Sequence, residues 1–202
     1  MNKNIKLFKA FLLVSIATLL ISAANSTKSK YLLSKGYTVT IFGTSNLHKW
    51  NETVETVSGD GSVNWNDDGS FDLESINLKM EVHSIKSDMG GVMNNNTYKA
   101  LKADNDPEII FTLTTPIKSI KTGPTTAVIS GKGNLTIAGV TKPIDMQIKV
   151  SIEDHTMMSF EGSQNIKMTD YGISPPTALF GTLKTGDEIT INFKTSFTVT
   201  TN

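Results

Sequence analysis

The sequence has no cysteine and no arginine among its 202 residues. Without cysteine, the chain cannot form disulfides, thiolate metal sites or a cysteine nucleophile, and it lacks the residue on which bacterial lipoproteins are lipidated. Without arginine, it lacks the planar guanidinium that suits phosphate and base recognition. Its 19 lysines are matched by 19 acidic residues, and no basic run stands out. These features disfavour a nucleic-acid partner and exclude thiol chemistry.

Long apolar runs are also rare, and the one exception lies at the N-terminus. Lys3, Lys6 and Lys9 precede an apolar stretch at 10–24 that ends in small residues. This stretch is shorter than the ~20 residues that a membrane-spanning helix usually needs. We therefore predict a signal peptide over residues 1–24, cleaved after Ala24, in preference to a retained membrane anchor. The expected location is periplasmic or secreted.

Cleavage at this point leaves a mature chain long enough for a single hydrophobic core. It carries 16 lysines against 19 acidic residues, a net charge of −3. Residues 25–30 are polar and are predicted to be flexible, and residues 31–202 are predicted to form one domain. No later segment is apolar enough to span a membrane. The sequence does not fix the oligomeric state, and a homodimer stays open.

Alternation of apolar and polar residues is the dominant pattern from Tyr31 onward. Every second residue is apolar in 76–82 and 144–152, and nearly every second one in 189–199. A period of two is typical of strands with one buried and one exposed face, and such strands usually pair antiparallel. Further strands are predicted at 37–42, 54–65, 108–114, 127–138 and 157–168.

Only residues 84–103 depart from the strand pattern. Within this segment, Asn94–Asn96 are a candidate helix cap and Thr97–Ala103 a short helix, which ends before the breaker Asn105–Pro107. Turn-forming clusters such as Asp67–Ser70 separate the strand runs. The predicted fold class is therefore all-β, with about eight antiparallel strands and one short helix in a long connection.

Strands with one apolar face must close into a barrel or pack on a second sheet, because open edges promote aggregation. About eight strands can form a barrel whose interior is wide enough for one ligand. The pattern alone does not separate this barrel from a two-sheet sandwich. Methionines on the apolar face, such as Met80 and Met146, suit an adaptable pocket, but ordinary core packing is the better explanation of them.

Four segments, in order along the chain, resemble the YceI-like family of lipocalin-like barrels associated with polyisoprenoid binding. They are FGTSNLHKW (42–50), SIKSDMGGVMNNNTYKALKADNDPEIIF (84–111), GKGNLTIAGVTKPIDMQIKV (131–150) and IKMTDYGISPPTALFGTLKTGDEITINF (166–193). Together, after a signal peptide, they resemble the version common in secreted proteins of Bacteroidetes. The Arg-Asp pair and the histidine that many members carry before the helix are absent at 93–98. Either the polar end of the ligand is read differently here or the ligand differs.

The resemblance implies an antiparallel lipocalin-like β-barrel that holds an amphiphile with an isoprenoid tail, such as a quinone, and no other cofactor. Apolar residues of one strand parity would line the barrel interior, and loop residues would contact the polar end of the ligand. The predicted ligand-binding residues are Val39, Ile41, His48, Ile76, Leu78, Met80, Asn95, Tyr98, Phe111, Leu113, Ile144, Met146, Ile148, Ile191, Phe193 and Phe197.

The sequence shows no catalytic or metal-binding motif. His48, His83 and His155 are far apart without metal-ligand spacing, and there is no GxSxG nucleophile elbow. We therefore predict a binding protein with no metal site and no enzymatic activity. Two alternatives stay open: an enzyme that acts through a polar cluster including His48 and Asp170, and a stress-related interaction module with a filled core.

Overall fold

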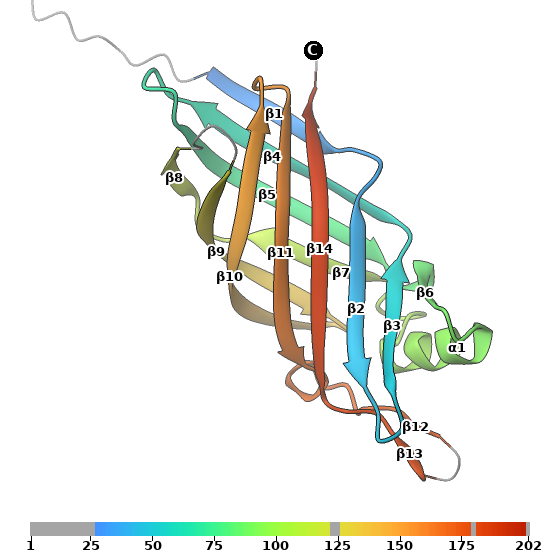
Figure 1. The fold of residues 1–202 in the computed structure, drawn as a ribbon. Coiled ribbons are helices and arrows are strands. Elements are labelled where there is room, and N and C mark those ends of the chain that lie inside the picture. Colours follow the sequence, from blue (N-terminus) through green and yellow to red (C-terminus); the bar gives the residue numbers. More distant parts are fainter. Residues whose placement is uncertain (1–26, 122–125, 179–180, 201–202) are drawn as a thin grey trace, which may run out of the picture.

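Eight antiparallel strands form a closed ring in the computed structural model, which describes residues 27–121, 126–178 and 181–200 (Figure 1). In order around the ring, they are β1 (Thr27–Leu33), β4 (Val57–Trp65), β5 (Phe71–Glu81), β7 (Glu108–Leu113), β9 (Ala127–Ile137), β10 (Val140–Glu153), β11 (Met157–Lys167) and β14 (Glu188–Val199). Pairing of β1 with β14 closes the ring. The predicted all-β antiparallel barrel is confirmed, and a sandwich of two separate sheets is excluded.

The barrel wall continues beyond this ring at one end through three shorter strands. The C-terminal part of β14 pairs with β1, whereas its N-terminal part pairs with β2 (Thr38–Thr44). The sheet then continues through β3 (Lys49–Val54) to β6 (Ile85–Ser87). Thus β1 and β2 are two pieces of one interrupted strand. Gly36, with a φ of 89°, lies at the interruption, and such a φ strongly favours glycine.

The helix α1 (Gly91–Ala100) follows β6 and lies beside it at this end of the barrel (Figure 1). It begins earlier and ends earlier than predicted, so Asn94–Asn96 lie inside the helix rather than at its cap. Asn94 instead accepts a hydrogen bond from the backbone N–H of Ser87 at 2.8 Å, which ties the helix to β6. Among the described residues, no helix has the length and apolar character of a membrane span.

Three other predictions about the elements need correction. Residues 27–30, which were predicted to precede the folded domain, are part of β1 and pair with β4, where Lys28 lies opposite Asn64. Residues 54–65 are not one strand, because β3 ends at Val54 and the backbone N–H of Thr56 binds the hydroxyl of Ser84 at 2.9 Å. The run at 157–168 ends in a 3-10 turn, η2 (Met168–Tyr171). The predicted signal peptide lies outside the described residues.

The remaining short elements lie at the periphery of the barrel. Strand β8 (Ile117–Ile120) pairs with β5, and β12 (Thr177–Ala178) pairs with β13 (Leu183–Lys184) as a small separate ribbon. A 3-10 turn, η1 (Val82–Ser84), links β5 to β6. In Figure 1 the β12–β13 ribbon lies at the same end of the barrel as α1.

The opposite end of the barrel is filled by its own side chains. Tyr31, Phe71 and Phe197 are fully buried there. The Tyr31 hydroxyl donates to the carbonyl oxygen of His155 at 2.6 Å, and the His155 ring stacks on Trp65 with 3.8 Å between ring centroids. The barrel is therefore closed at the end of the β10–β11 turn. Any space inside it must lie toward α1.

Candidate functional site

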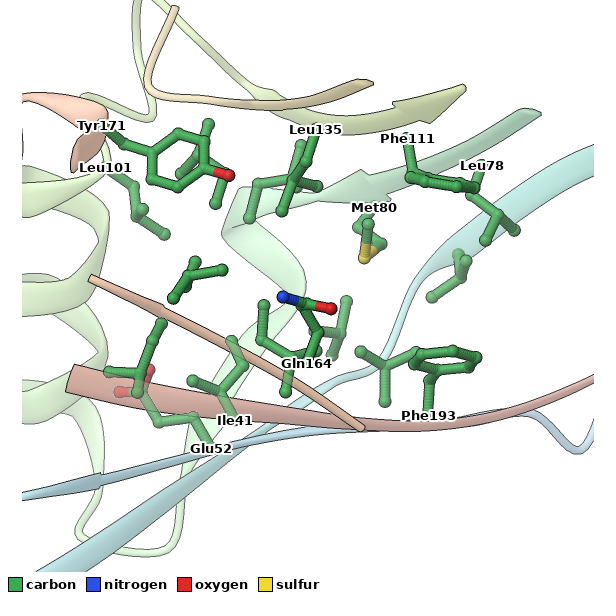
Figure 2. Close-up of a pocket in the computed structure, with 18 of the residues that line it drawn as sticks. Ile41, Glu52, Leu78, Met80, Leu101, Phe111, Leu135, Gln164, Tyr171 and Phe193 are labelled. Carbon is green, nitrogen blue, oxygen red and sulfur yellow. The ribbon is translucent and has the colours of Figure 1, made fainter. Parts of the chain in front are cut away.

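The interior of the barrel contains a cavity of about 170 Å³, lined by inward-facing side chains of the barrel strands and by α1. Figure 2 shows Glu52, Leu101 and Tyr171 around its end near the helix, and Leu78, Phe111 and Phe193 farther along the barrel. A volume of this size holds on the order of ten water-sized groups. The interior is therefore hollow, which contradicts the alternative of a completely filled core.

All of the apolar residues predicted from strand parity line this cavity. They are Val39, Ile41, Ile76, Leu78, Met80, Phe111, Leu113, Ile144, Met146, Ile148, Ile191, Phe193 and Phe197. Their shared orientation follows from the pleat of the strands, which places every second side chain on the same face. Contact of these residues with a ligand stays a prediction.

Two aromatic rings lie against the wall because glycines occupy the neighbouring strand. A Cβ atom at Gly133 would lie 2.2 Å from Cε2 of Phe111, and one at Gly162 would lie 2.5 Å from Cζ of Phe193. Either contact is far shorter than van der Waals distance. The absence of these two Cβ atoms lets the rings pack flat on the sheet, so that they do not cross the interior.

The three polar residues predicted to contact the ligand lie outside the cavity. His48 is exposed, and its Nε2 lies 3.4 Å from the sulfur of Met89. Asn95 is exposed on α1. The Tyr98 hydroxyl lies 2.9 Å from the carbonyl oxygens of both His83 and Ile85, and it accepts a hydrogen bond from Lys86. These placements correct the prediction.

The helical periodicity of α1 explains why Asn95 and Tyr98 do not face the cavity. Because an α-helix repeats every 3.6 residues, the residues of α1 that face the cavity are spaced by three and four positions. These residues are Met93, Asn96, Thr97 and Ala100.

Several residues of the cavity wall were not predicted from the sequence. Leu135, Ile137 and Ile109 have the inward parity of strands that were predicted, so the same rule could have found them. Trp50 and Glu52 come from β3, whose pattern has no apolar alternation. Other lining residues missed are Val54, Val57, Leu73, Leu101, Phe160, Gln164, Ile166, Met168, Tyr171, Ile173, Pro176, Thr185, Ile189 and Thr195.

Glu52 is the one acidic side chain among the described residues that line the cavity. It is only 2% exposed, and its Oε1 accepts a hydrogen bond of 2.6 Å from the Thr97 hydroxyl of α1. Burial raises the pKa of the Glu52 carboxyl above its usual range, and the bond from Thr97 offsets part of this rise. A buried carboxyl group thus lies at the helix end of a mostly apolar cavity.

Two further polar side chains reach into the cavity. Figure 2 shows the Tyr171 hydroxyl near the helix end and the Gln164 amide farther along the barrel. Burial raises the pKa of Tyr171, and the charge of the adjacent Asp170 adds to this effect. Neither Asp170 nor His48, the residues of the enzyme alternative, lines the cavity. In the described ranges, no group of three or more His, Asp or Glu side chains could hold a metal ion.

A smaller pocket of about 50 Å³ adjoins the helix end of the cavity. The two spaces share the lining residues Trp50, Met93, Asn96, Pro176 and Thr185. His48 and Met89 belong to this outer pocket, which explains why the sequence around His48 looked like part of a site. The shared residues form the boundary between the cavity and the surface, and we call this boundary the mouth.

The raised pKa of Glu52 predicts a pH-dependent stability. The pKa of Glu52 is higher in the folded protein than in the unfolded protein, so between these two values the folded protein binds more protons. The contribution of Glu52 to the free energy of unfolding therefore falls as the pH rises through this interval. Glu52→Gln removes this effect and keeps an acceptor for Thr97. The variant should therefore gain stability over the wild type as the pH rises from about 4 to about 8, as measured by urea unfolding. Glu161→Gln, at an exposed position of β11, is the matched control. A stability difference for Glu52→Gln that does not change with pH would contradict the prediction.

The closed ring of eight antiparallel strands around an apolar cavity defines a lipocalin-like β-barrel. A family model described as the YceI-like domain matches residues 26–197. The chain therefore belongs to the YceI-like domain family, as its sequence motifs indicated. A comparison with curated proteins found no match.

Solved structures share the fold at low sequence identity. A polyisoprenoid binding domain from Saccharophagus degradans, implicated in plant cell wall breakdown, is 14% identical with a TM-score of 0.67, over 86% of this chain and 100% of that one. BcnA from Burkholderia cenocepacia is 17% identical with a TM-score of 0.57, over 79% and 95%. The YCEI protein from Campylobacter jejuni is 19% identical with a TM-score of 0.53, over 75% and 85%. At these identities, the likeness is one of fold.

Proposed function

We propose that the protein binds an amphiphilic lipid with an isoprenoid tail, such as a quinone, inside the barrel. The observation that carries this proposal is the cavity, whose wall is mostly apolar and whose one carboxyl group, Glu52, lies near α1. A long apolar ligand with one polar end is complementary to this distribution. Membership of the YceI-like family supports the proposal, since a domain of the same fold from S. degradans is described as polyisoprenoid binding.

The proposed role is binding rather than catalysis, in the periplasm or outside the cell. The signal peptide predicted at residues 1–24 supports export. The polar side chains that line the cavity are those of Glu52, Asn96, Thr97, Gln164, Tyr171, Thr185 and Thr195. Polar groups of this kind can orient the polar end of a bound lipid, as a binding protein requires.

The size of the cavity limits the affinity for the lipid. Room for on the order of ten groups corresponds to about two isoprene units. At ~0.8 kcal/mol per buried methylene, their burial contributes roughly 8 kcal/mol, against an association cost of about 4–15 kcal/mol. Tails of more than two isoprene units therefore gain further affinity only if side chains of the cavity wall move to enlarge the cavity. Met80, Met93, Met146 and Met168 can adapt in this way, because their side chains are unbranched.

A chain-length series tests the proposal. Prenol, geraniol and farnesol share a hydroxyl end and contain one, two and three isoprene units. We expect the dissociation constant to fall at least about tenfold from prenol to geraniol, and less from geraniol to farnesol as the cavity fills. Trp50 lines the cavity, so the Trp65→Phe variant reports binding through Trp50 fluorescence. Equal affinity for all three alcohols would contradict enclosure of the tail.

A further inference from the structure

Glu52 occupies a position where a buried carboxyl group is hard to explain by the fold alone. Trp50, Glu52 and Val54 share the inward parity of β3, so the strand directs a carboxyl group into an apolar space. A leucine at this position would pack in the apolar interior without the cost of desolvating a carboxyl group. The Thr97 hydroxyl is the one side-chain partner that the described residues provide for this carboxyl. The second carboxyl oxygen therefore has bonding capacity left for a guest.

The charges around the cavity limit what that guest can be. No lysine or histidine is among the described residues that line the cavity, and the sequence has no arginine. Lys49, which precedes Trp50, is exposed on the outward parity of β3. A phosphate or carboxylate drawn inside would lose its hydration without meeting a cation, and it would lie near Glu52. An anionic polar end is therefore strongly disfavoured inside the barrel.

The orientation of a bound lipid follows from the two ends of the barrel. The far end is sealed by buried aromatic residues such as Tyr31 and Phe71, so a tail must point toward them. The polar end then stays near the mouth, where Glu52, Thr97 and Tyr171 lie. A hydroxyl at this place can donate to an ionised carboxylate or accept from a protonated carboxyl group. It suits Glu52 in either state.

We propose, building on the function proposed above, that Glu52 contacts the polar end of the lipid and makes the cavity selective for uncharged, hydrogen-bonding ends over phosphates and carboxylates. The class of ligand is then an isoprenoid alcohol or a lipid with a carbonyl end. Lipid phosphates with the same tail are excluded.

Matched ligands test this selectivity. Farnesol and farnesyl phosphate have the same tail and differ in the charge of the end. Wild-type protein should bind farnesol at least about tenfold more tightly than farnesyl phosphate, at concentrations below those at which either lipid forms micelles. Titration calorimetry gives both affinities. Equal binding, or tighter binding of the phosphate, would overturn the selectivity while leaving the lipid-binding function intact.

Two variants assign the selectivity to Glu52. Glu52→Gln keeps the shape of the side chain and a hydrogen-bond acceptor but cannot become charged. The ratio of the dissociation constants of farnesyl phosphate and farnesol should therefore fall several-fold. Glu52→Leu removes the hydrogen bond to the alcohol and should weaken farnesol binding about tenfold. Glu161→Gln, at an exposed position of β11, should leave both affinities unchanged. If both Glu52 variants retain wild-type affinities, Glu52 does not contact the polar end. If wild-type protein binds neither lipid, both the proposed lipid binding and this inference are contradicted.

Discussion

Replacing Ile191 with tryptophan is expected to weaken binding of geranylgeraniol at least about 100-fold. Ile191 lines the cavity from the N-terminal part of β14, opposite Gln164 of β11 and Ile41 of β2. It is partly buried and borders open space, so an indole side chain at this place would enter the cavity. A cavity of about 170 Å³ cannot hold both an indole ring and an isoprenoid tail. Because each excluded methylene group forfeits ~0.8 kcal/mol, loss of a few groups already gives the expected factor.

The control for this variant is Lys194→Trp, which places the same side chain on the outward parity of the same strand. Lys194 is exposed, so this variant should bind geranylgeraniol with wild-type affinity. Circular dichroism and urea unfolding should show that both variants are folded, since overpacking costs about 1–3 kcal/mol. Retained binding by folded Ile191→Trp would show that the lipid does not enter the barrel.

Replacing Phe197 with alanine is expected to lower the free energy of unfolding by about 3–5 kcal/mol. Phe197 is 0% exposed and packs edge-to-face on Phe160, with 5.7 Å between the ring centroids and 85° between the ring planes. It borders the cavity on the side of the filled end. Its removal takes away this packing and enlarges the cavity, and the surrounding sheet cannot collapse to fill the space because its hydrogen-bonded ring is closed.

Phe42→Ala is the matched control for this second variant, because Phe42 lies on β2 and is 41% exposed. Urea unfolding should show a loss below about 1 kcal/mol for Phe42→Ala and several times more for Phe197→Ala. Similar losses for the two variants would mean that the filled end of the barrel does not stabilise the fold as described.

Strand parity predicted the wall of the cavity because the period of two in a strand leaves no freedom about which side chains share a face. Once 76–82, 144–152 and 189–199 are strands, their alternate apolar residues must face one side. Parity does not give the order of the strands or the closure between β1 and β14, which join the two ends of the chain. The family resemblance supplied that part of the prediction.

The polar part of the site was harder to predict, for two physical reasons. The first turns of α1 contain glycine and asparagine, which are weak helix formers, so the sequence pattern did not place Met93 and Asn96 in a helix. Glu52 breaks the rule that inward residues are apolar, so a sequence pattern places it outside. Only the contact with Thr97 of α1, which is 45 residues away, reveals that it is buried.

The most direct test of lipid binding inside the barrel is a crystal structure of protein purified without detergent and soaked with geranylgeraniol. We predict continuous elongated density that begins beside Glu52 and runs along the barrel to the level of Phe111 and Phe193. Density for the lipid only on the outer surface, with the interior occupied by the protein's own side chains, would contradict the proposal.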